Sequence, residues 1–381
     1  MLNCTKAPFL VNFSHLLIVP VNRQICRSQD WDRAQYPTGD RRLKVMSPLL
    51  EVQDLHVYYQ TARGPVKAVN GVSFEVREGE RYGLIGESGS GKSTIALAIL
   101  RLIKPPGQIV SGRILLDGVD LLGLSEEEMR QQRLASVALV TQGAMNSLNP
   151  VIRIRDLIAD GLSNHGVRMS AREIQTHIAD LLARVGLRSE VAGMYPHELS
   201  GGMKQRVCIA IAISLRPRLI IADEPTSALD VVVQRQVMQT LRKVQEELGA
   251  AVILIGHDMG LMAQFADRMG VVYAGRQVEE GGVEELFAQP KHPYSQLLMA
   301  SLPTLEEKGV FQEAQGAPPS MLDLPTGCVF HPRCPYVMER CTLEEPQLQM
   351  VWSGHRAACH LLDGDRSLDR SVAQIQEDIS S

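Results

Sequence analysis

Short apolar runs alternate with helical stretches along most of the chain. Between Leu49 and about Ala144, runs typical of strands surround one helix that begins after Lys92. The alternation resumes at residue 218 and includes a helix over residues 231–248. The predicted strands cover residues 72–76, 81–85, 113–116, 136–140, 218–222, 251–255 and 271–273. Strands that alternate with helices predict an α/β fold with a largely parallel sheet.

Two segments depart from this alternation. Residues 145–200 lack strong strand signals and include an amphipathic stretch at residues 171–185, which predicts an inserted helical subdomain. After Pro303 the pattern gives way to segments rich in Pro, Glu and Cys. We therefore expect a core domain over residues 47–303 and a C-terminal extension over residues 304–381.

The N-terminal residues 1–46 show no sustained periodicity. Met46 opens the segment MSPLLEVQDLHVYY, whose alternation is typical of an edge strand. We hypothesise that Met46 is the natural start and that the preceding residues are a gene-calling extension. The apolar run at residues 9–21 behind Lys6 resembles a poor signal-peptide core, but no small-residue cleavage site follows it.

Composition narrows the functional classes. The chain has 381 residues, a formal net charge of −4 and only 4% aromatic residues, which disfavours nucleic-acid binding. No apolar run reaches the roughly 18–20 residues that span a bilayer. Seven cysteines, an odd number with uneven spacing, do not resemble a secreted disulfide framework.

A phosphate-binding loop is predicted at residues 86–93, which fit the pattern G-x-x-x-x-G-K-[ST] between an apolar strand and a helix. Its backbone amides and the helix N-terminus suit phosphate oxygens. Lys92 is expected to reach the β- and γ-phosphates, and Ser93 to bind Mg²⁺. The nucleotide contacts expected here are Gly86, Glu87, Ser88, Gly89, Ser90, Gly91, Lys92, Ser93 and Thr94.

A pair of acids follows the apolar run at residues 219–222. Asp223 is expected to reach Mg²⁺ through water, and Glu224 to polarise the attacking water as the catalytic base. Paired acids are often only a solvated strand end. The two acids follow an apolar run and lie far downstream of a phosphate-binding loop in the sequence, and this order favours the catalytic role.

Residues 199–206, LSGGMKQR, resemble the ABC signature L-S-G-G-Q, with Met203 in place of Gln. The chain is similar to the ABC ATPases, which are P-loop NTPases, over about residues 49–300. The resemblance implies ATP hydrolysis at the interface of two such subunits. It also implies that Ser200, Gly201 and Gly202 of one subunit close over the γ-phosphate bound by the other.

Further positions match that family in order along the chain. Tyr59 resembles the aromatic residue that stacks on adenine, although Tyr58 is an alternative. Gln142 resembles the loop glutamine that senses Mg²⁺ and the membrane subunit. Residues 227–230 resemble the D-loop, and His257 resembles the switch histidine, here a catalytic residue that contacts the γ-phosphate.

Three segments resemble the ATPases of oligopeptide, dipeptide and nickel importers: GAMNSLNPV after Gln142, KHPYSQLL at residues 291–298 and GCVFHPRCP at residues 327–335. This resemblance implies import of dipeptides or oligopeptides, with nickel or another small solute as the alternative. A non-transport ABC ATPase is the distant alternative, because the chain has one motif set and no long coiled-coil insertion.

The same resemblance implies the partners and the location. The partners are two transmembrane permease subunits, a second ABC ATPase in a homodimer or heterodimer, and an extracytoplasmic solute-binding protein that acts through the permeases; no nucleic acid is expected. The subunit would lie peripherally on the cytoplasmic face of the inner cell membrane.

Four cysteines of the extension follow the spacing C-x5-C-x6-C-x17-C: Cys328, Cys334, Cys341 and Cys359. Four thiolates can hold zinc or an iron–sulfur cluster. The importer family carries a [4Fe–4S] cluster on a matching extension, so the resemblance favours the cluster. Zinc and free or transiently oxidised thiols are the alternatives.

Overall fold

The computed structural model describes residues 48–141, 147–300 and 316–363. The chain divides into two units, Met1–Met46 and Ser47–Ser381, and all described residues belong to the second unit. The hypothesised start at Met46, the apolar run at residues 9–21 and Gln142 lie outside the described residues. None of the helices in the described ranges is long and apolar enough to cross a membrane.

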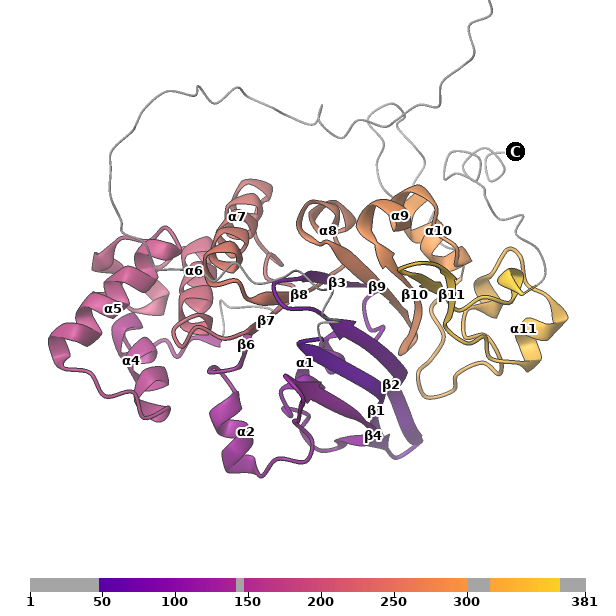
Figure 1. The fold of residues 1–381 in the computed structure, drawn as a ribbon, viewed down its shortest axis with the longest axis horizontal. Helices are drawn as coiled ribbons and strands as arrows, with labels where there is room; N and C mark the ends of the chain where they lie inside the picture. The colour runs from indigo at the N-terminus through magenta and orange to yellow at the C-terminus, as the bar shows by residue number, and fades with distance from the viewer. Residues whose placement is uncertain (1–47, 142–146, 301–315, 364–381) are drawn as a thin grey trace, which may run out of the picture. The chain divides into compact units, whose positions relative to one another are not determined.

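An eight-stranded sheet forms the centre of the fold, in the order β11-β12-β10-β9-β3-β8-β7-β6 (Figure 1). Five neighbouring strands are parallel, as the sequence predicts: β3 (Arg81–Ile85), β6 (Val137–Val140), β7 (Leu219–Asp223), β8 (Ala251–Gly256) and β9 (Arg268–Tyr273). Every residue of β7 and β8 is buried, which matches the apolar sequence of β8 and that of β7 as far as Ala222.

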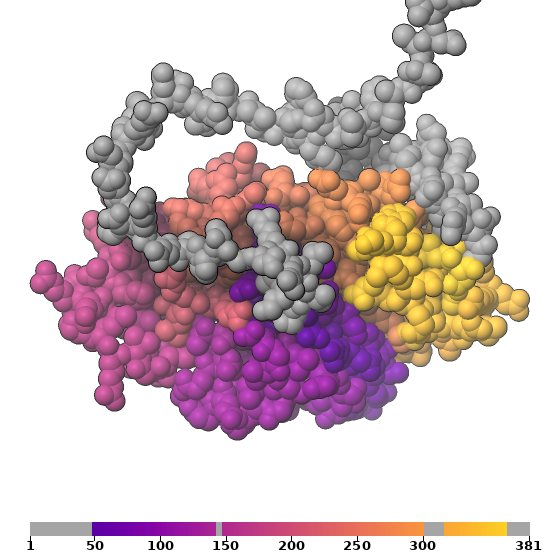
Figure 2. Space-filling view, in the orientation of Figure 1, coloured from indigo at the N-terminus to yellow at the C-terminus, as the bar shows by residue number. Residues whose placement is uncertain are grey.

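The C-terminal extension continues this sheet. β10 (Arg276–Gly282) is antiparallel to β9 and also pairs with β12 (His355–Ala357), which pairs with β11 (Gln349–Trp352). In the space-filling view the yellow residues of the extension lie directly against the orange segment that precedes them (Figure 2). The two strands of the extension were not predicted from the sequence, and the domain division at residues 303 and 304 stays a prediction.

A second, antiparallel sheet has the order β2-β1-β4-β5. Its strands are β1 (Leu50–Thr61), β2 (Gly64–Val76), β4 (Gly107–Leu116) and β5 (Val119–Asp120). β1 pairs with β2 on one side and β4 on the other, so the expectation of an edge strand at this position is wrong. An antiparallel sheet with one solvated face produces alternation in its inner strands as well.

The helices of the core follow the predicted alternation. α1 (Lys92–Ile99) follows β3, and α7 (Val231–Leu248) has the predicted bounds. Between residues 147 and 200 the structure describes helices and no strand: α4 (Ile154–Asn164), α5 (Ala171–Arg184), η2 (Ser189–Gly193) and η3 (Pro196–Glu198). The other helices are α2 (Glu126–Gln132), α6 (Gly201–Ala212), α8 (Met259–Phe265), α9 (Val283–Ala288), α10 (Pro293–Ala300), η4 (His331–Arg333), α11 (Glu339–Leu343) and η5 (His360–Leu362).

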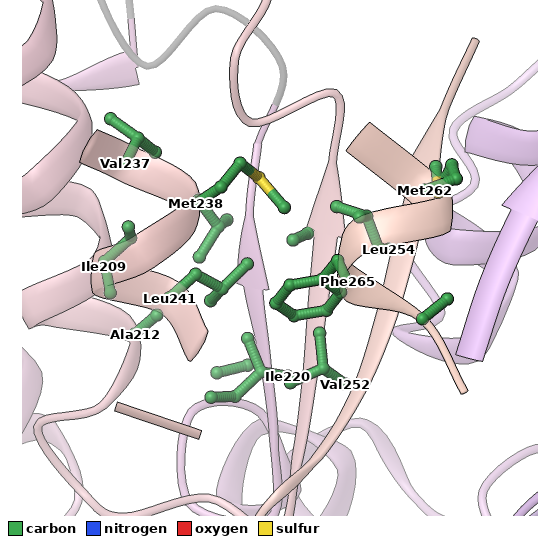
Figure 3. Close-up of a cluster of buried hydrophobic side chains, with 14 of the residues drawn as sticks. Ile209, Ala212, Ile220, Val237, Met238, Leu241, Val252, Leu254, Met262 and Phe265 are labelled. Carbon is green, nitrogen blue, oxygen red and sulfur yellow. The ribbon is translucent and has the colours of Figure 1, made fainter. Parts of the chain in front are cut away.

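Apolar side chains from α6, α7 and α8 meet the central strands in one buried cluster (Figure 3). Ile209, Leu241 and Phe265 lie over Ile220 of β7 and Val252 of β8, and all five are at most 3% exposed. Burial of a large apolar side chain stabilises a fold by about 1.5–3 kcal/mol. This packing holds β7 and β8 in place under the helices.

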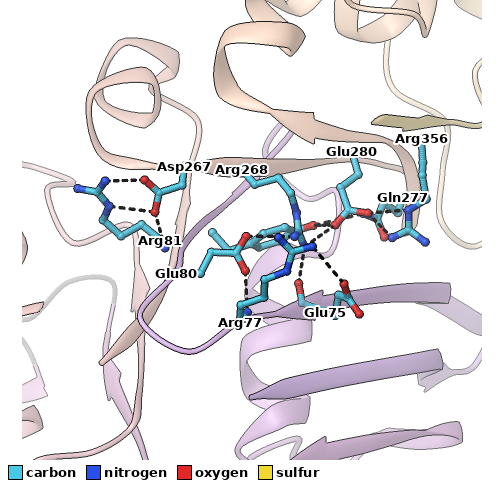
Figure 4. Close-up of polar contacts among 10 residues, drawn as sticks. Glu75, Arg77, Glu80, Arg81, Asp267, Arg268, Gln277, Glu280 and Arg356 are labelled. Atoms are coloured by element: carbon cyan, nitrogen blue, oxygen red, sulfur yellow. Dashed lines mark hydrogen bonds and ion pairs between the residues drawn. The ribbon is translucent and has the colours of Figure 1, made fainter. Parts of the chain in front are cut away.

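A buried ion-pair network joins both sheets to the extension (Figure 4). The guanidinium of Arg268 on β9 contacts Glu80 Oε1 at 3.1 Å and Glu280 Oε1 at 3.2 Å, and it also donates to the carbonyl oxygen of Glu75 on β2. Arg356 of β12 donates from Nε to Glu280 Oε2 at 2.9 Å. These contacts hold the extension against the core.

Candidate active site

The loop between β3 and α1 depends on two glycines. Gly86 has a φ of +152°, and a Cβ there would lie 2.0 Å from the carbonyl oxygen of Val272. Gly91 has a φ of +105°, and a Cβ there would lie 2.2 Å from the carbonyl oxygen of Ala68. Only glycine fits both positions, so the loop curls tightly ahead of the N-terminus of α1.

Lys92 is buried in this loop, with 5% of its surface exposed. Its Nζ donates to the carbonyl oxygens of Gly86 at 2.7 Å and Glu87 at 2.8 Å, and to Ser90 Oγ at 3.2 Å. Burial lowers the pKa of Lys92, while the nearby charges of Glu224, Asp223 and Glu87 oppose that shift. The ammonium is therefore held inside the loop where phosphate oxygens would bind.

Ser93 and Asp223 meet beside the loop. Ser93 Oγ, in the first turn of α1, donates to Asp223 Oδ1 at 3.0 Å at the end of β7. Burial raises the pKa of Asp223, and the hydrogen bond from Ser93 opposes the shift. A hydroxyl and a carboxylate are ligands that suit Mg²⁺, so the residues present fit the expected cation.

Glu224 and His257 form a second pair, one residue beyond the ends of the neighbouring strands β7 and β8. His257 Nδ1 lies 3.1 Å from Glu224 Oε1. The backbone amide of Glu224 donates to the carbonyl oxygen of Ile255 at 2.9 Å, and its φ is +43°. The carboxyl group is thus anchored through its backbone and oriented by an imidazole, a geometry suited to a general base.

The predicted signature residues begin α6. Ser200 is the N-cap of that helix, and its hydroxyl accepts a hydrogen bond from the amide of Met203 at 3.3 Å. A Cβ at Gly202 would lie 2.4 Å from Val233 Cγ1 on α7, so glycine is required there for the two helices to approach. Ser200 is exposed and Gly201 is partly exposed. Their expected contact with a second subunit stays a prediction.

The predicted adenine contact is on β1. The Tyr59 ring is half-buried and packs over Gly107, where a Cβ would lie 2.6 Å from Tyr59 Cε1. Tyr58 instead donates from its hydroxyl to Asn70 Oδ1 at 2.9 Å. Tyr59 therefore stays the predicted stacking residue. Gln142 cannot be placed, because it lies outside the described residues.

The four cysteines of the extension are neighbours. Burial raises the pKa of Cys359 to about 12 and that of Cys334 to about 11, and in each case charges on other thiols of the group add to the shift. The amide of Cys328 donates to the carbonyl oxygen of Cys341 at 2.8 Å. In the described part of the chain, however, no three Cys, His, Asp or Glu side chains are arranged to hold a metal ion. The four expected ligands are thus near one another, but their side chains do not point to a common metal position.

Two contacts of the phosphate loop were not predicted from the sequence. The two terminal nitrogens of Arg333, Nη1 and Nη2, donate to the carboxylate of Glu87, and the amide of Glu87 donates to the hydroxyl of Tyr294. Arg333 and Tyr294 stand in the segments GCVFHPRCP and KHPYSQLL, which the sequence singled out only by resemblance. No local pattern indicates that either segment reaches the loop.

Comparisons with known proteins agree with this geometry. A family described as "ABC transporter" matches residues 69–227, and one described as "Oligopeptide/dipeptide transporter, C-terminal region" matches residues 278–341. The chain is 44% identical over 316 residues to the dipeptide transport ATP-binding protein DppD of Haemophilus influenzae, and the match covers 82% of this chain and 95% of that protein. It is 42% identical to DppD of Escherichia coli, over 82% of this chain and 96% of that protein.

A solved structure is also similar. It is the dimeric, post-hydrolysis state of the ATP-binding cassette MJ0796 bound to ADP and Pi, with a TM-score of 0.56 and 28% sequence identity. The match covers 61% of this chain and 98% of that structure.

Proposed function

Because this chain belongs to the ATP-binding subunits of ABC transporters, we propose that it hydrolyses ATP to energise the import of dipeptides or oligopeptides. Relatives named for dipeptide transport support this cargo, as does the match to the oligopeptide/dipeptide C-terminal region. Nickel or another small solute is the nearest alternative, since an ATP-binding subunit does not itself contact the cargo.

The observation that carries the proposal is the meeting of the phosphate loop with the ends of β7 and β8. The hydrogen bond from Ser93 to Asp223 joins the loop to one acid, and the contact of His257 with Glu224 orients the other. All four side chains lie at the carboxyl-end side of a parallel sheet or at the helix that follows it, where ligands of such folds bind.

In the proposed reaction Lys92 leaves the carbonyl oxygens of Gly86 and Glu87 and donates to the phosphates instead. Ser93 and Asp223 would hold Mg²⁺, which neutralises charge on the β- and γ-phosphates. Glu224 accepts a proton from the attacking water, while His257 holds the carboxylate in place. The adenine would stack on Tyr59.

The assembly we propose has two ATP-binding subunits beneath two transmembrane permease subunits, on the cytoplasmic face of the membrane. Ser200, Gly201 and Gly202 of each subunit would complete the site of the other. The dimeric state of the similar cassette MJ0796 supports this arrangement. An extracytoplasmic solute-binding protein would deliver the peptide to the permeases.

We also propose that the extension carries a [4Fe–4S] cluster on Cys328, Cys334, Cys341 and Cys359. The support is the grouping of four thiols that are buried or half-buried, in which the charges of neighbouring thiols help to raise the pKa of Cys334 and of Cys359. A cluster spreads its thiolate ligands over several irons, so they need not converge on one ion. Brown protein with bound iron and sulfide after anaerobic purification is expected; colourless, zinc-containing protein would contradict it.

The catalytic assignment is tested with Glu224→Gln. This variant should bind Mg-ATP like the unmodified protein and hydrolyse it about 10²–10⁴-fold more slowly, the usual contribution of a general base. Glu285→Gln on α9 is a matched control, because Glu285 lies in the first turn of a helix outside this site. Unchanged turnover in Glu224→Gln would refute the assigned base.

A further inference from the structure

Glu87 of the phosphate loop is held from three directions. Its carbonyl oxygen accepts a hydrogen bond of 2.8 Å from Lys92, and its amide donates one of 2.9 Å to the hydroxyl of Tyr294 on α10. Its carboxylate oxygens accept two hydrogen bonds of 3.1 Å from the guanidinium of Arg333. Two of the three partners therefore come from beyond the parallel core.

The pair between Arg333 and Glu87 is largely removed from water. Only 6% of the Arg333 side chain and 28% of the Glu87 side chain are exposed. Arg333 also donates to the hydroxyl of Tyr273 at 3.1 Å, and its guanidinium lies 5.7 Å from the centre of that ring. A bidentate pair between an arginine and a carboxylate in a mostly buried site has a specific geometry. Removal of one partner leaves the charge of the other without a counterpart.

The segment that carries Arg333 is firmly packed. Arg333 is the last residue of the short helix η4, which Phe330 precedes and Cys334 follows. Phe330 is fully buried, and its ring lies 5.2 Å from that of Tyr273 and 5.5 Å from that of Tyr294. Aromatic side chains from β9, from α10 and from the residue before η4 thus pack into one cluster next to the phosphate loop.

We propose that Arg333 and Tyr294 are positioning residues for ATP binding, supplied to the phosphate loop by the C-terminal part of the chain. Arg333 neutralises a carboxylate that would otherwise repel the triphosphate, and both residues fix the loop around Lys92. This inference rests on the proposed binding of ATP at the loop. It assigns the extension a direct part in forming the nucleotide site.

The test measures the affinity of the full chain for the fluorescent nucleotide MANT-ATP with Mg²⁺. Arg333→Gln is expected to weaken binding about tenfold, as fits the loss of a hydrogen bond between charged groups. At saturating ATP its kcat should change much less than its KM. Arg333→Lys should recover part of the affinity. Arg340→Gln is the matched control, because Arg340 pairs with Glu344 and Asp363 on the exposed surface of the same extension.

A double variant separates positioning from general damage to the fold. Glu87→Gln in the Arg333→Gln background removes the unpaired carboxylate, so its affinity loss should be smaller than the sum of the two single losses. Additive losses, or wild-type affinity in Arg333→Gln, would overturn the inference. If the unmodified chain binds MANT-ATP no better than Lys92→Ala, the proposed ATP site itself fails, which is a distinguishable result.

Discussion

Ser93 Oγ and Asp223 Oδ1 lie 3.0 Å apart, across 130 positions of sequence, and join the first turn of α1 to the end of β7. The hydroxyl and the carboxylate that would hold the cation are thus adjacent, although they come from two distant segments of the chain.

Asp223→Asn should raise the Mg²⁺ concentration that ATPase activity requires, and it should affect the affinity for nucleotide less. The amide retains the size of the side chain but loses its charge, so the Mg²⁺ concentration for half-maximal ATPase activity should rise about 10–100-fold, as for other outer-shell partners of metals. Titration of activity with Mg²⁺ at fixed ATP measures this. Asp180→Asn, at an exposed position of α5, should leave the titration curve unmoved.

Stability at mildly acidic pH should depend on His292. This residue is buried, its Nδ1 accepts a hydrogen bond of 3.0 Å from the amide of Tyr294, and burial lowers its pKa to about 4. An unfolded histidine has a pKa near 6.5, so the unfolded chain binds more protons between these values. The free energy of unfolding should therefore fall as pH falls through this window, by about 2 kcal/mol between pH 7 and pH 5.

Denaturant unfolding of His292→Asn at both pH values checks this contribution. Asparagine can still accept the hydrogen bond from Tyr294 but does not titrate, so the pH dependence should shrink. His197→Asn, at an exposed position, should retain the full dependence of the unmodified protein. Equal pH dependence in all three proteins would show that His292 is not responsible.

The capping box of α5 should contribute to stability without affecting catalysis. Ser170 Oγ accepts from the amide of Glu173 at 3.3 Å, and Glu173 Oε2 accepts from the amide of Ser170 at 2.7 Å. Ser170→Ala should lower the free energy of unfolding by about 1 kcal/mol. Thr176→Ala on the same helix removes a hydroxyl bonded to the carbonyl of Arg172 and a methyl group at an exposed position, so stability should hold or rise. ATPase activity should be unchanged in both.

The elements that the sequence predicted well carry local signals. The bounds of α7 follow from its helical period, from the N-cap Asp230 and from the left-handed Gly249 after its last residue. The loop around Lys92 and the acids Asp223 and Glu224 follow from motif spacing. The contact of Glu224 with His257 then results from β7 and β8 being parallel neighbours.

Features that depend on distant partners were not predictable. β12 has three residues, too few for a period, and forms a strand because it pairs with β10 on one side and β11 on the other. The alternation of β1 could not distinguish an edge strand from an inner one. Arg333 and Glu87 are 246 positions apart, and neither local sequence indicates the other.

The central claim is tested most directly by reconstituting the full importer in proteoliposomes, with this chain, its permeases and the cognate solute-binding protein. ATP hydrolysis and uptake of labelled dipeptide should both rise when the binding protein is loaded with peptide, and Glu224→Gln should lower both by about 10²-fold or more. Stimulation by a nickel-loaded binding protein but not by a peptide-loaded one would contradict the proposed cargo, and hydrolysis at the unmodified rate in Glu224→Gln would contradict the proposed site.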